Sequence, residues 1–213
     1  PDYVMVHQSI RDELIKEMKR AINDFYGDDV KGSESLGRII NERHFNRLRN
    51  ILESDKEGLI YGGEYDEEEK YIAPSIIQVK DWNAACMKEE IFGPILPIME
   101  YSDLNEVVNA INKQPKSLAL YLFTSDKRVE KKVLNEISSG GVSINDTILH
   151  LANSNLPFGG VGNAGMGAYH GEESFRTFSH RKSVLKKSRV LNTTLMYPPY
   201  SDKKLMVIKR FLK

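Results

Sequence analysis

The chain has 213 residues, 40% of them hydrophobic, which is enough for one sizeable core or for one core with an appended arm. Lys plus Arg and Asp plus Glu both number 30, so the formal net charge is zero and no overall field favours nucleic acid or an anionic membrane. The single cysteine, Cys86, excludes an internal disulfide and fits a reducing, cytoplasmic compartment. No apolar run approaches the ~18 residues of a membrane span. Because the first residue is Pro1, we expect the chain to be a piece of a longer protein.

The first third of the chain predicts two helices followed by a strand. Ser9 begins a capping-box pattern, apolar residues recur at helical spacing behind it, and Gly27 marks the expected end of the helix. A second helix is predicted over residues 44–52. Residues 71–77 have the composition of a strand, and Pro74 indicates that it lies at a sheet edge or ends there.

An alternation of strands and helices follows in the middle of the chain. We predict strands over residues 95–101, 118–124 and 142–145, separated by helices whose first residues follow the caps Asp103 and Ser125. Strands joined by helices at this spacing form crossover units. The sequence therefore predicts an α/β fold, with a mostly parallel sheet and helices on both faces.

Residues 151–171, the glycine-rich segment, have little periodicity. A loop of that length is usually functional or disordered, and its aromatic residues and apolar flanks argue against disorder. Glycines let a backbone approach a ligand closely, but their spacing does not match the dinucleotide fingerprint, which follows a strand and opens a helix. A flexible active-site loop and a plain linker both stay open on these residues alone. Residues 178–187 have the composition of one more strand.

Two adjacent carboxylates, Glu89 and Glu90, precede the apolar strand over residues 95–101. A carboxylate can accept hydrogen bonds from two neighbouring sugar hydroxyls, as in a ribose, or act as a general acid or base. A charged, solvated turn before a strand is the simpler interpretation. Phe92, beside them, is in general more often a core residue than a stacking surface.

No reactive group is evident in the sequence. The five histidines are scattered and no pair has the spacing of ligands on one helix face, so a zinc site is not expected. Acidic residues follow Cys86 and would raise the pKa of its thiol, which predicts a passive side chain rather than a nucleophile. No Ser-His-Asp set is evident either. The residues alone therefore indicate half of a ligand cleft without its reactive group.

Three motifs occur in the order EEIFGPILPI, SSGGVSIND and LPFGGVGNAGMGAYHG, and they resemble the C-terminal half of aldehyde dehydrogenases. The likeness is strongest to the class 3, fatty-aldehyde branch, which PDYVMV, LGRIINERHF, YIAPSII, FSHRKSVL and YPP also fit. The resemblance covers essentially the whole chain. It implies most of the aldehyde dehydrogenase catalytic domain over residues 1–170, and an oligomerisation strand with a C-terminal tail over residues 171–213.

The resemblance implies two groups of binding residues. Glu90 would hold the nicotinamide ribose of NAD or NADP, and Phe92 would pack beside the nicotinamide, so that the ring is oriented for hydride transfer. The glycine-rich segment would wall a channel for the aldehyde. The implied channel residues are Phe158 and, as weaker candidates, Ile148, Leu151 and His170. Residues 178–187 would join the sheet of a partner subunit and give a homodimer.

The resemblance also implies what the chain does not contain. The family's nucleophilic cysteine would lie just upstream of Pro1, and the glutamate base and the dinucleotide-binding domain would also lie upstream. We therefore expect the complete enzyme to oxidise aldehydes, of the aliphatic or fatty class, to carboxylic acids through a cysteine thioester. The chain alone should be inactive.

Two other functions stay open. The chain could be a standalone, non-catalytic half that assembles with a separate N-terminal chain, or the enzyme could pass its acyl group to coenzyme A. The sequence does not choose between NAD and NADP, nor does it define the aldehyde chain length. Basic residues around short apolar patches in the tail permit contact with a membrane surface, whereas nucleic acid is not an expected partner.

Overall fold

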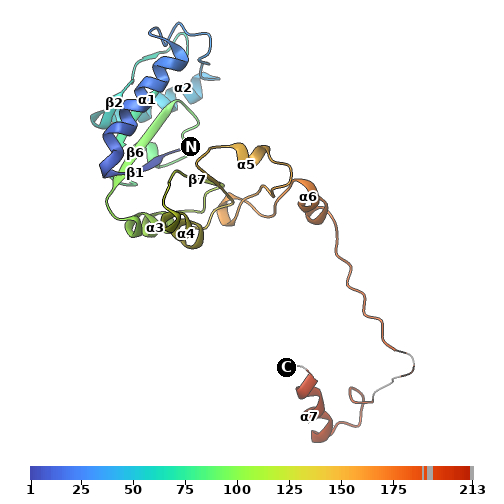
Figure 1. The fold of residues 1–213 in the computed structure, drawn as a ribbon. Coiled ribbons are helices and arrows are strands. Elements are labelled where there is room, and N and C mark those ends of the chain that lie inside the picture. Colours follow the sequence, from blue (N-terminus) through green and yellow to red (C-terminus); the bar gives the residue numbers. More distant parts are fainter. Residues whose placement is uncertain (189, 191–193, 212–213) are drawn as a thin grey trace. The chain divides into compact units, whose positions relative to one another are not determined.

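The computed structural model describes residues 1–188, 190 and 194–211. The chain divides into two compact units, Pro1–Thr177 and Phe178–Lys213. Figure 1 follows the elements of each unit along the chain. The candidate site residues implied by the sequence all belong to the first unit.

A four-stranded sheet with the strand order β1-β6-β5-β2 organises the first half of the first unit. Its strands are β1 (Val4–His7), β2 (Leu59–Tyr61), β5 (Ser75–Val79) and β6 (Ile95–Tyr101). β6 pairs in parallel with both β1 and β5, whereas β2 runs antiparallel to β5. The two helices of this region are α1 (Arg11–Tyr26) and α2 (Glu42–Ser54).

Alternate residues of β6 face different helices. Ile98 packs in one cluster with Ile15 of α1, whereas Ile95 and Met99 pack in another with Leu48 of α2. Because successive side chains of a strand point to opposite faces, this division means that α1 and α2 cover the two faces of the sheet. The predicted α/β class with mostly parallel strands is confirmed.

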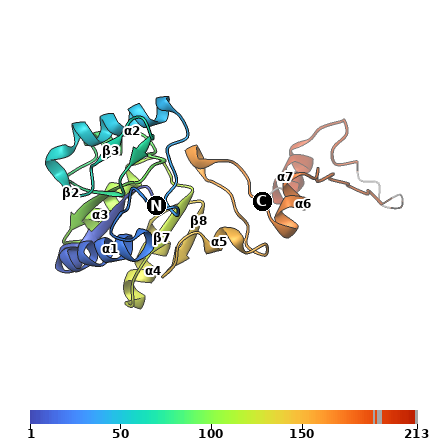
Figure 2. The same ribbon diagram turned by 90° about the horizontal axis from the view of Figure 1, so that it is seen from above.

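A second, parallel pair of strands consists of β7 (Ala119–Leu122) and β8 (Gly141–Ile144). The helices α3 (Leu104–Asn112) and α4 (Lys127–Glu136) pack on it, and Figure 2 shows α4 beside these strands. The hydrophobic cluster of this part includes Val108, Leu120, Val133 and Ile137. β6 pairs with neither β7 nor β8. The three strands predicted in the middle of the chain therefore do not share one hydrogen-bonded sheet.

The remaining elements are short. β3 (Tyr65–Asp66) and β4 (Tyr71–Ile72) form an antiparallel pair, and α5 (Leu149–Ala152) and α6 (Gly171–Thr177) flank the loop of the glycine-rich segment. The 3-10 turns are Gln8–Ile10, Lys56–Gly58, Ala85–Met87 and Gly162–Ala164. The second unit holds α7 (Asp202–Phe211). Within the described ranges, no helix combines the length and apolar character that crossing a membrane requires.

Of the two predicted ends of α1, the C-terminal end is confirmed and the N-terminal cap is wrong. Gly27 ends the helix with φ +77°, and its N–H donates to the Asn23 carbonyl at 2.8 Å. Ser9 does not cap the helix, because its hydroxyl lies 2.7 Å from Nδ1 of His7 and a 3-10 turn precedes α1. Asp103 caps α3 as predicted, accepting the N–H two residues further on.

Of two other local predictions, one needs correction and one is confirmed in one of its two alternatives. Asp126 rather than Ser125 caps α4, since its carboxylate accepts the N–H of Arg128 at 2.8 Å. The prediction that the strand ends at Pro74 is confirmed, because β4 ends at Ile72 and a new strand, β5, starts at Ser75. The edge alternative does not hold for β5, which lies between β6 and β2. The pairing of β5 resumes at once because the N–H of Ser75 donates to the Pro94 carbonyl at 2.8 Å.

The strand predicted over residues 178–187 is not formed in this chain. The described part of the second unit contains no strand, and Phe178 and Leu185 are 84% and 96% exposed. A strand needs a neighbouring backbone to accept and donate its hydrogen bonds, and none is available within this unit's described residues. Pairing with a partner subunit stays a prediction.

Candidate functional site

The acidic segment, residues 89–93, lies against α2 immediately before β6. Ile91 is 2% exposed and belongs to the same hydrophobic cluster as Leu48 of α2. Gly93 passes so close to this helix that a Cβ would lie 2.6 Å from both methyl carbons of Leu48. The path of the acidic segment is therefore set by contact with Leu48, which comes more than forty residues before Gly93 in the chain.

Two polar side chains hold the backbone of the acidic segment. The guanidinium of Arg47 donates to the Glu89 carboxylate at 3.3 Å, to the Glu90 carbonyl at 3.4 Å and to the Ile91 carbonyl. On the other side, the N–H of Ile91 donates to Oδ1 of Asp2 at 2.9 Å. Both ends of the Ile91 residue are thus hydrogen-bonded to residues distant in sequence.

Glu90 and Phe92 project from this fixed backbone. The Glu90 side chain is exposed and makes no hydrogen bond or ion pair with any of the described residues. Phe92 has φ +46°, uncommon for a residue other than glycine, and its side chain is 80% exposed. The core interpretation of Phe92 does not hold, because the buried residue of this stretch is Ile91.

These features fit a nicotinamide nucleotide. A carboxylate without a protein partner keeps all its lone pairs for two vicinal hydroxyls, and an exposed ring offers a flat apolar face to a second ring. A backbone held in a sparsely populated conformation is common at ligand sites. Glu90 and Phe92, the residues implied for NAD or NADP, are thus presented together.

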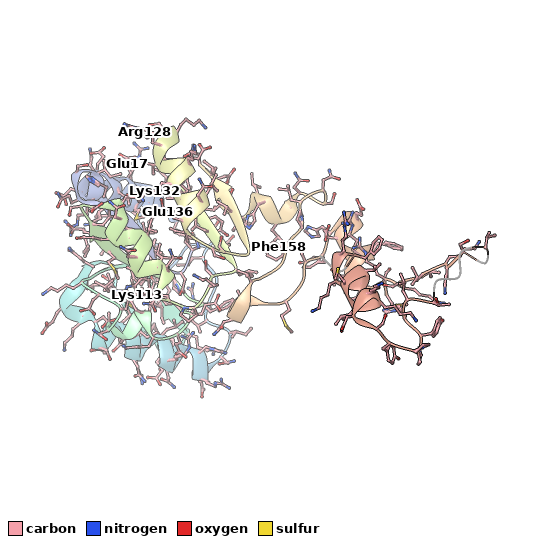
Figure 3. All side chains as sticks on the ribbon, turned by 90° about the horizontal axis from the view of Figure 1, so that it is seen from below. Glu17, Lys113, Arg128, Lys132, Glu136 and Phe158 are labelled. Atoms are coloured by element: carbon pink, nitrogen blue, oxygen red, sulfur yellow. The ribbon has the colours of Figure 1, made fainter. Side chains whose placement is uncertain are left out.

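The glycine-rich segment closes on itself around Phe158, which is labelled in Figure 3. Phe158 and Tyr169 form an antiparallel bridge with both N–H to carbonyl distances at 2.9 Å. The Phe158 and His170 rings stack with centroids 6.2 Å apart, and Nδ1 of His170 lies 3.2 Å from the Leu156 carbonyl. Two of the implied channel residues, Phe158 and His170, are therefore in contact.

Ile148 and Leu151, the other two implied channel residues, lie at α5. They are joined by the Leu151 N–H to Ile148 carbonyl hydrogen bond at 2.8 Å, and their side chains are 38% exposed or more. Ile148 has φ +64°, a strained value for a β-branched residue.

His150 is a member of this group that the sequence did not indicate. Its ring lies 5.9 Å from that of Tyr121 and 5.8 Å from that of Phe158, centroid to centroid. It also lies against Gly141 of β8, where a Cβ would meet the imidazole at 2.9 Å. Both ring nitrogens are buried without a partner among the described residues. The rings of this cluster come from irregularly spaced positions of the chain, so no periodic pattern in the sequence indicates that they meet.

The pKa of the Cys86 thiol is raised, as the sequence predicted, but for a different main reason. The side chain is 1% exposed in the cluster beneath α2, and the Asp55 carboxylate accepts the Cys86 N–H at 2.8 Å. Burial first, and the hydrogen bond with Asp55 second, raise the pKa of the thiol to about 12. Nucleophilic attack needs the thiolate, so this thiol is unreactive near neutral pH.

The fold and this site define the class of protein. The chain belongs to the aldehyde dehydrogenase family, whose model matches residues 1–184. It is similar to solved aldehyde dehydrogenases, including the structure described as the substrate-bound state of Staphylococcus aureus AldH. That structure is 46% identical, with a TM-score of 0.84, and the match covers 100% of this chain and 46% of that one.

Curated relatives give the branch within the family. The 4,4'-diaponeurosporen-aldehyde dehydrogenase of Staphylococcus aureus is 46% identical over 100% of this chain and 46% of its own length. Aldehyde dehydrogenase family 3 member A2 of Rattus norvegicus is 47% identical over 100% of this chain and 44% of its own. The dimeric NADP-preferring enzyme of the same species is 47% identical over 93% and 44%. The predicted class 3 likeness is confirmed, and the chain spans somewhat less than half the length of these relatives.

Proposed function

We propose that this chain supplies catalytic-domain residues to an NAD(P)-dependent aldehyde dehydrogenase that oxidises aliphatic or fatty aldehydes to carboxylic acids. The observation that carries the proposal is the pairing of an exposed, unpartnered carboxylate at Glu90 with an exposed ring at Phe92 on a buried, hydrogen-bonded backbone. Membership of the family and the names of the relatives support the reaction class.

Glu90 and Phe92 would orient the nicotinamide and its ribose. The Glu90 carboxylate would accept hydrogen bonds from the two hydroxyls of the nicotinamide ribose, and the Phe92 ring would pack beside the nicotinamide. When bound, NAD or NADP supplies the acceptor for the hydride of the aldehyde carbon. Holding the two reacting centres in one geometry removes the entropy cost of bringing them together.

The aldehyde would lie along the glycine-rich segment. Phe158 and His170 provide its aromatic wall, and the exposed apolar side chains of Ile148 and Leu151 suit an aliphatic tail. The nucleophilic cysteine would come from a segment that precedes Pro1 in the complete enzyme. Cys86 cannot replace it, because the high pKa keeps its thiol protonated.

Assembly and location complete the proposal. Residues 178–187 would pair with the sheet of a second subunit and give a homodimer. The name of one relative describes that enzyme as dimeric. The enzyme would work in the cytoplasm. α7 carries exposed Met206 and Phe211 among the basic residues Lys209 and Arg210, which suits weak contact with an anionic membrane surface.

The test is nucleotide reduction by the full-length enzyme, followed as NADH or NADPH absorbance with aldehydes of increasing chain length. We expect turnover, with Glu90→Gln raising the KM for the nucleotide on the order of tenfold. Glu57→Gln, at an exposed carboxylate in a 3-10 turn, is the matched control and should behave as wild type. Absence of turnover with every aldehyde and both nucleotides would refute the proposal.

Two further experiments distinguish the proposed enzyme from a coenzyme A-acylating enzyme and from a split enzyme. A thioester product that requires added coenzyme A would identify the acylating enzyme instead of the hydrolytic one. The 213-residue chain alone should show no turnover, and activity restored by a separate N-terminal chain would identify a split enzyme.

A further inference from the structure

We propose that Arg47 is a positioning residue for nucleotide binding, which sets the place of Glu90 and Phe92 and neutralises the neighbouring carboxylate of Glu89. This inference rests on the proposed function, since it concerns the residues that would hold NAD or NADP. The role is indirect, because Arg47 contacts the acidic segment and acts through it.

One guanidinium serves three acceptors. Nη1 of Arg47 lies 3.3 Å from Oε1 of Glu89 and 3.4 Å from the Glu90 carbonyl, while Nη2 donates to the Ile91 carbonyl. The Arg47 side chain is 23% exposed, which limits competition from water for these acceptors. Two successive carbonyls are therefore fixed immediately before the backbone takes the positive φ of Phe92.

The arrangement requires arginine. A guanidinium presents five donors in a planar, rigid fork, whereas the ammonium of lysine is a point charge on a flexible stem. Arg47→Lys would keep a positive charge near Glu89 and remove the simultaneous hold on the two carbonyls. The substitution therefore separates the positioning effect from the effect of charge.

Arg47 also gives the two adjacent carboxylates different environments. Glu89 is paired with Arg47, whereas Glu90 has no ion pair with any described residue. A carboxylate that already accepts a guanidinium N–H on one oxygen, as Glu89 does on Oε1, has fewer lone pairs left for sugar hydroxyls. The pairing thus leaves Glu90, which comes one residue closer to Phe92, as the free carboxylate.

The part of α2 that carries Arg47 is anchored in the hydrophobic core. Phe45 and Leu48, which flank Arg47 on α2, are 1% and 0% exposed. Gly93 is in close contact with Leu48, and Asp2 holds the N–H of Ile91. The acidic segment is therefore held by residues whose own positions are set by the hydrophobic core, which is what a precise binding site needs.

The test compares NADH and NADPH binding by fluorescence titration of the full-length wild type, Arg47→Lys and Arg49→Lys. Arg49 is the matched control, because it lies on the same helix, is 30% exposed, and pairs with Glu67 at 3.2 Å instead of with the acidic segment. We expect Arg47→Lys to raise the Kd about tenfold and Arg49→Lys to change it less than about twofold. Thermal unfolding of both variants checks that they remain folded.

A double-mutant cycle with Glu90→Gln separates positioning from a general structural effect. If Arg47 acts through Glu90, Arg47→Lys should add less than about twofold to the Kd of the Glu90→Gln enzyme. A purely structural role would add its whole effect in either background. Glu89→Gln keeps the two carbonyl contacts, so we expect a smaller loss, about threefold.

The outcomes are distinct. If the wild type binds NADH or NADPH and Arg47→Lys binds it equally well, the inference is overturned and the proposed function stands. Additive effects in the cycle overturn it as well. If the wild type binds neither nucleotide, the proposed function fails, and the role of Arg47 fails with it.

Discussion

The two parts of the candidate site are held in place by different kinds of contact. The acidic segment depends on residues far away in sequence, since Arg47 and Asp2 are 43 and 89 residues from the groups they bind. The glycine-rich segment is closed by its own bridge between Phe158 and Tyr169. Local loops open without unfolding the core, whereas segments bound into the core open only with it.

This difference suits the two proposed ligands. The two hydroxyls of a nicotinamide ribose have a fixed spacing, and a rigid segment that presents Glu90 and Phe92 would orient that part of the nucleotide at low entropy cost. Aldehydes of different chain length need a wall that adapts, which a loop closed by a few aromatic contacts can provide. We therefore expect a substitution that loosens one of these two segments to leave the other unchanged.

The largest effect should come from Leu48→Ala. Leu48 is 0% exposed beneath the acidic segment, and truncation of a buried leucine costs about 2–5 kcal/mol in the free energy of unfolding. Urea unfolding measures the loss, and hydrogen exchange locates it. The Ile91 N–H should exchange faster while the Tyr169 N–H, which opens locally, keeps its rate. Equal acceleration at both amides would show that the two parts open together.

Gly160→Ala should loosen the glycine-rich segment and leave the acidic segment unchanged. A Cβ at Gly160 would overlap the carbonyl of Ala164, and a backbone clash of this kind costs about 1–3 kcal/mol. The Tyr169 N–H should exchange faster, and the KM for aldehyde should rise in the full-length enzyme. Gly37→Ala is the control, because a Cβ there meets nothing within 4 Å. An unchanged Tyr169 N–H would mean that the loop accommodates the methyl group.

Asp2→Ala should loosen only the acidic segment. The substitution removes the acceptor of the Ile91 N–H and should cost about 1–3 kcal/mol if that buried donor finds no other partner. Asp2→Asn retains an acceptor oxygen and should lose less. Hydrogen exchange at Ile91 distinguishes the two variants, and identical rates would place the support of this amide elsewhere.

The last prediction concerns Cys86, which reports on the core beneath α2. Its pKa of about 12 in the folded chain lies above the ordinary 9.0, so the unfolded state releases this proton first as pH rises. Stability should therefore fall between about pH 9 and 12, and less steeply in Cys86→Ala, as urea midpoints would show. The folded thiol should resist a thiol reagent at pH 8 in wild type and Gly160→Ala, but react faster in Leu48→Ala. Rapid labelling of the folded wild type would contradict its burial.

Local sequence was enough for most helices and strands, because each is set by nearby residues. The end of α1 at Gly27 and the cap of α3 at Asp103 require only a few neighbouring residues. The Ser9 cap was wrong because a histidine two residues earlier competes for the same hydroxyl. Local patterns did not predict which strands pair: β6 pairs with β1 and β5, whereas β7 pairs with β8.

The site shows the same division. The motifs around Glu90, Phe92 and Phe158 indicated the family and the residues to examine, since motif and order are properties of the sequence itself. Neither Arg47 nor His150 could be found that way, because their partners are brought near only when helices pack on strands. The strand expected over residues 178–187 needs a second backbone, so this chain by itself does not form it.

The sequence by itself determined the α/β class, the family and the presence of two adjacent carboxylates before a buried strand. Only the tertiary structure decided which carboxylate is free, because an ion pair from α2 occupies Glu89 and leaves Glu90 exposed. It also decided that Ile91 is buried and Phe92 is not, since hydrogen bonds from two distant residues fix the backbone between them. A local pattern encodes which groups are present, whereas their environment depends on long-range contacts that form only in the folded chain.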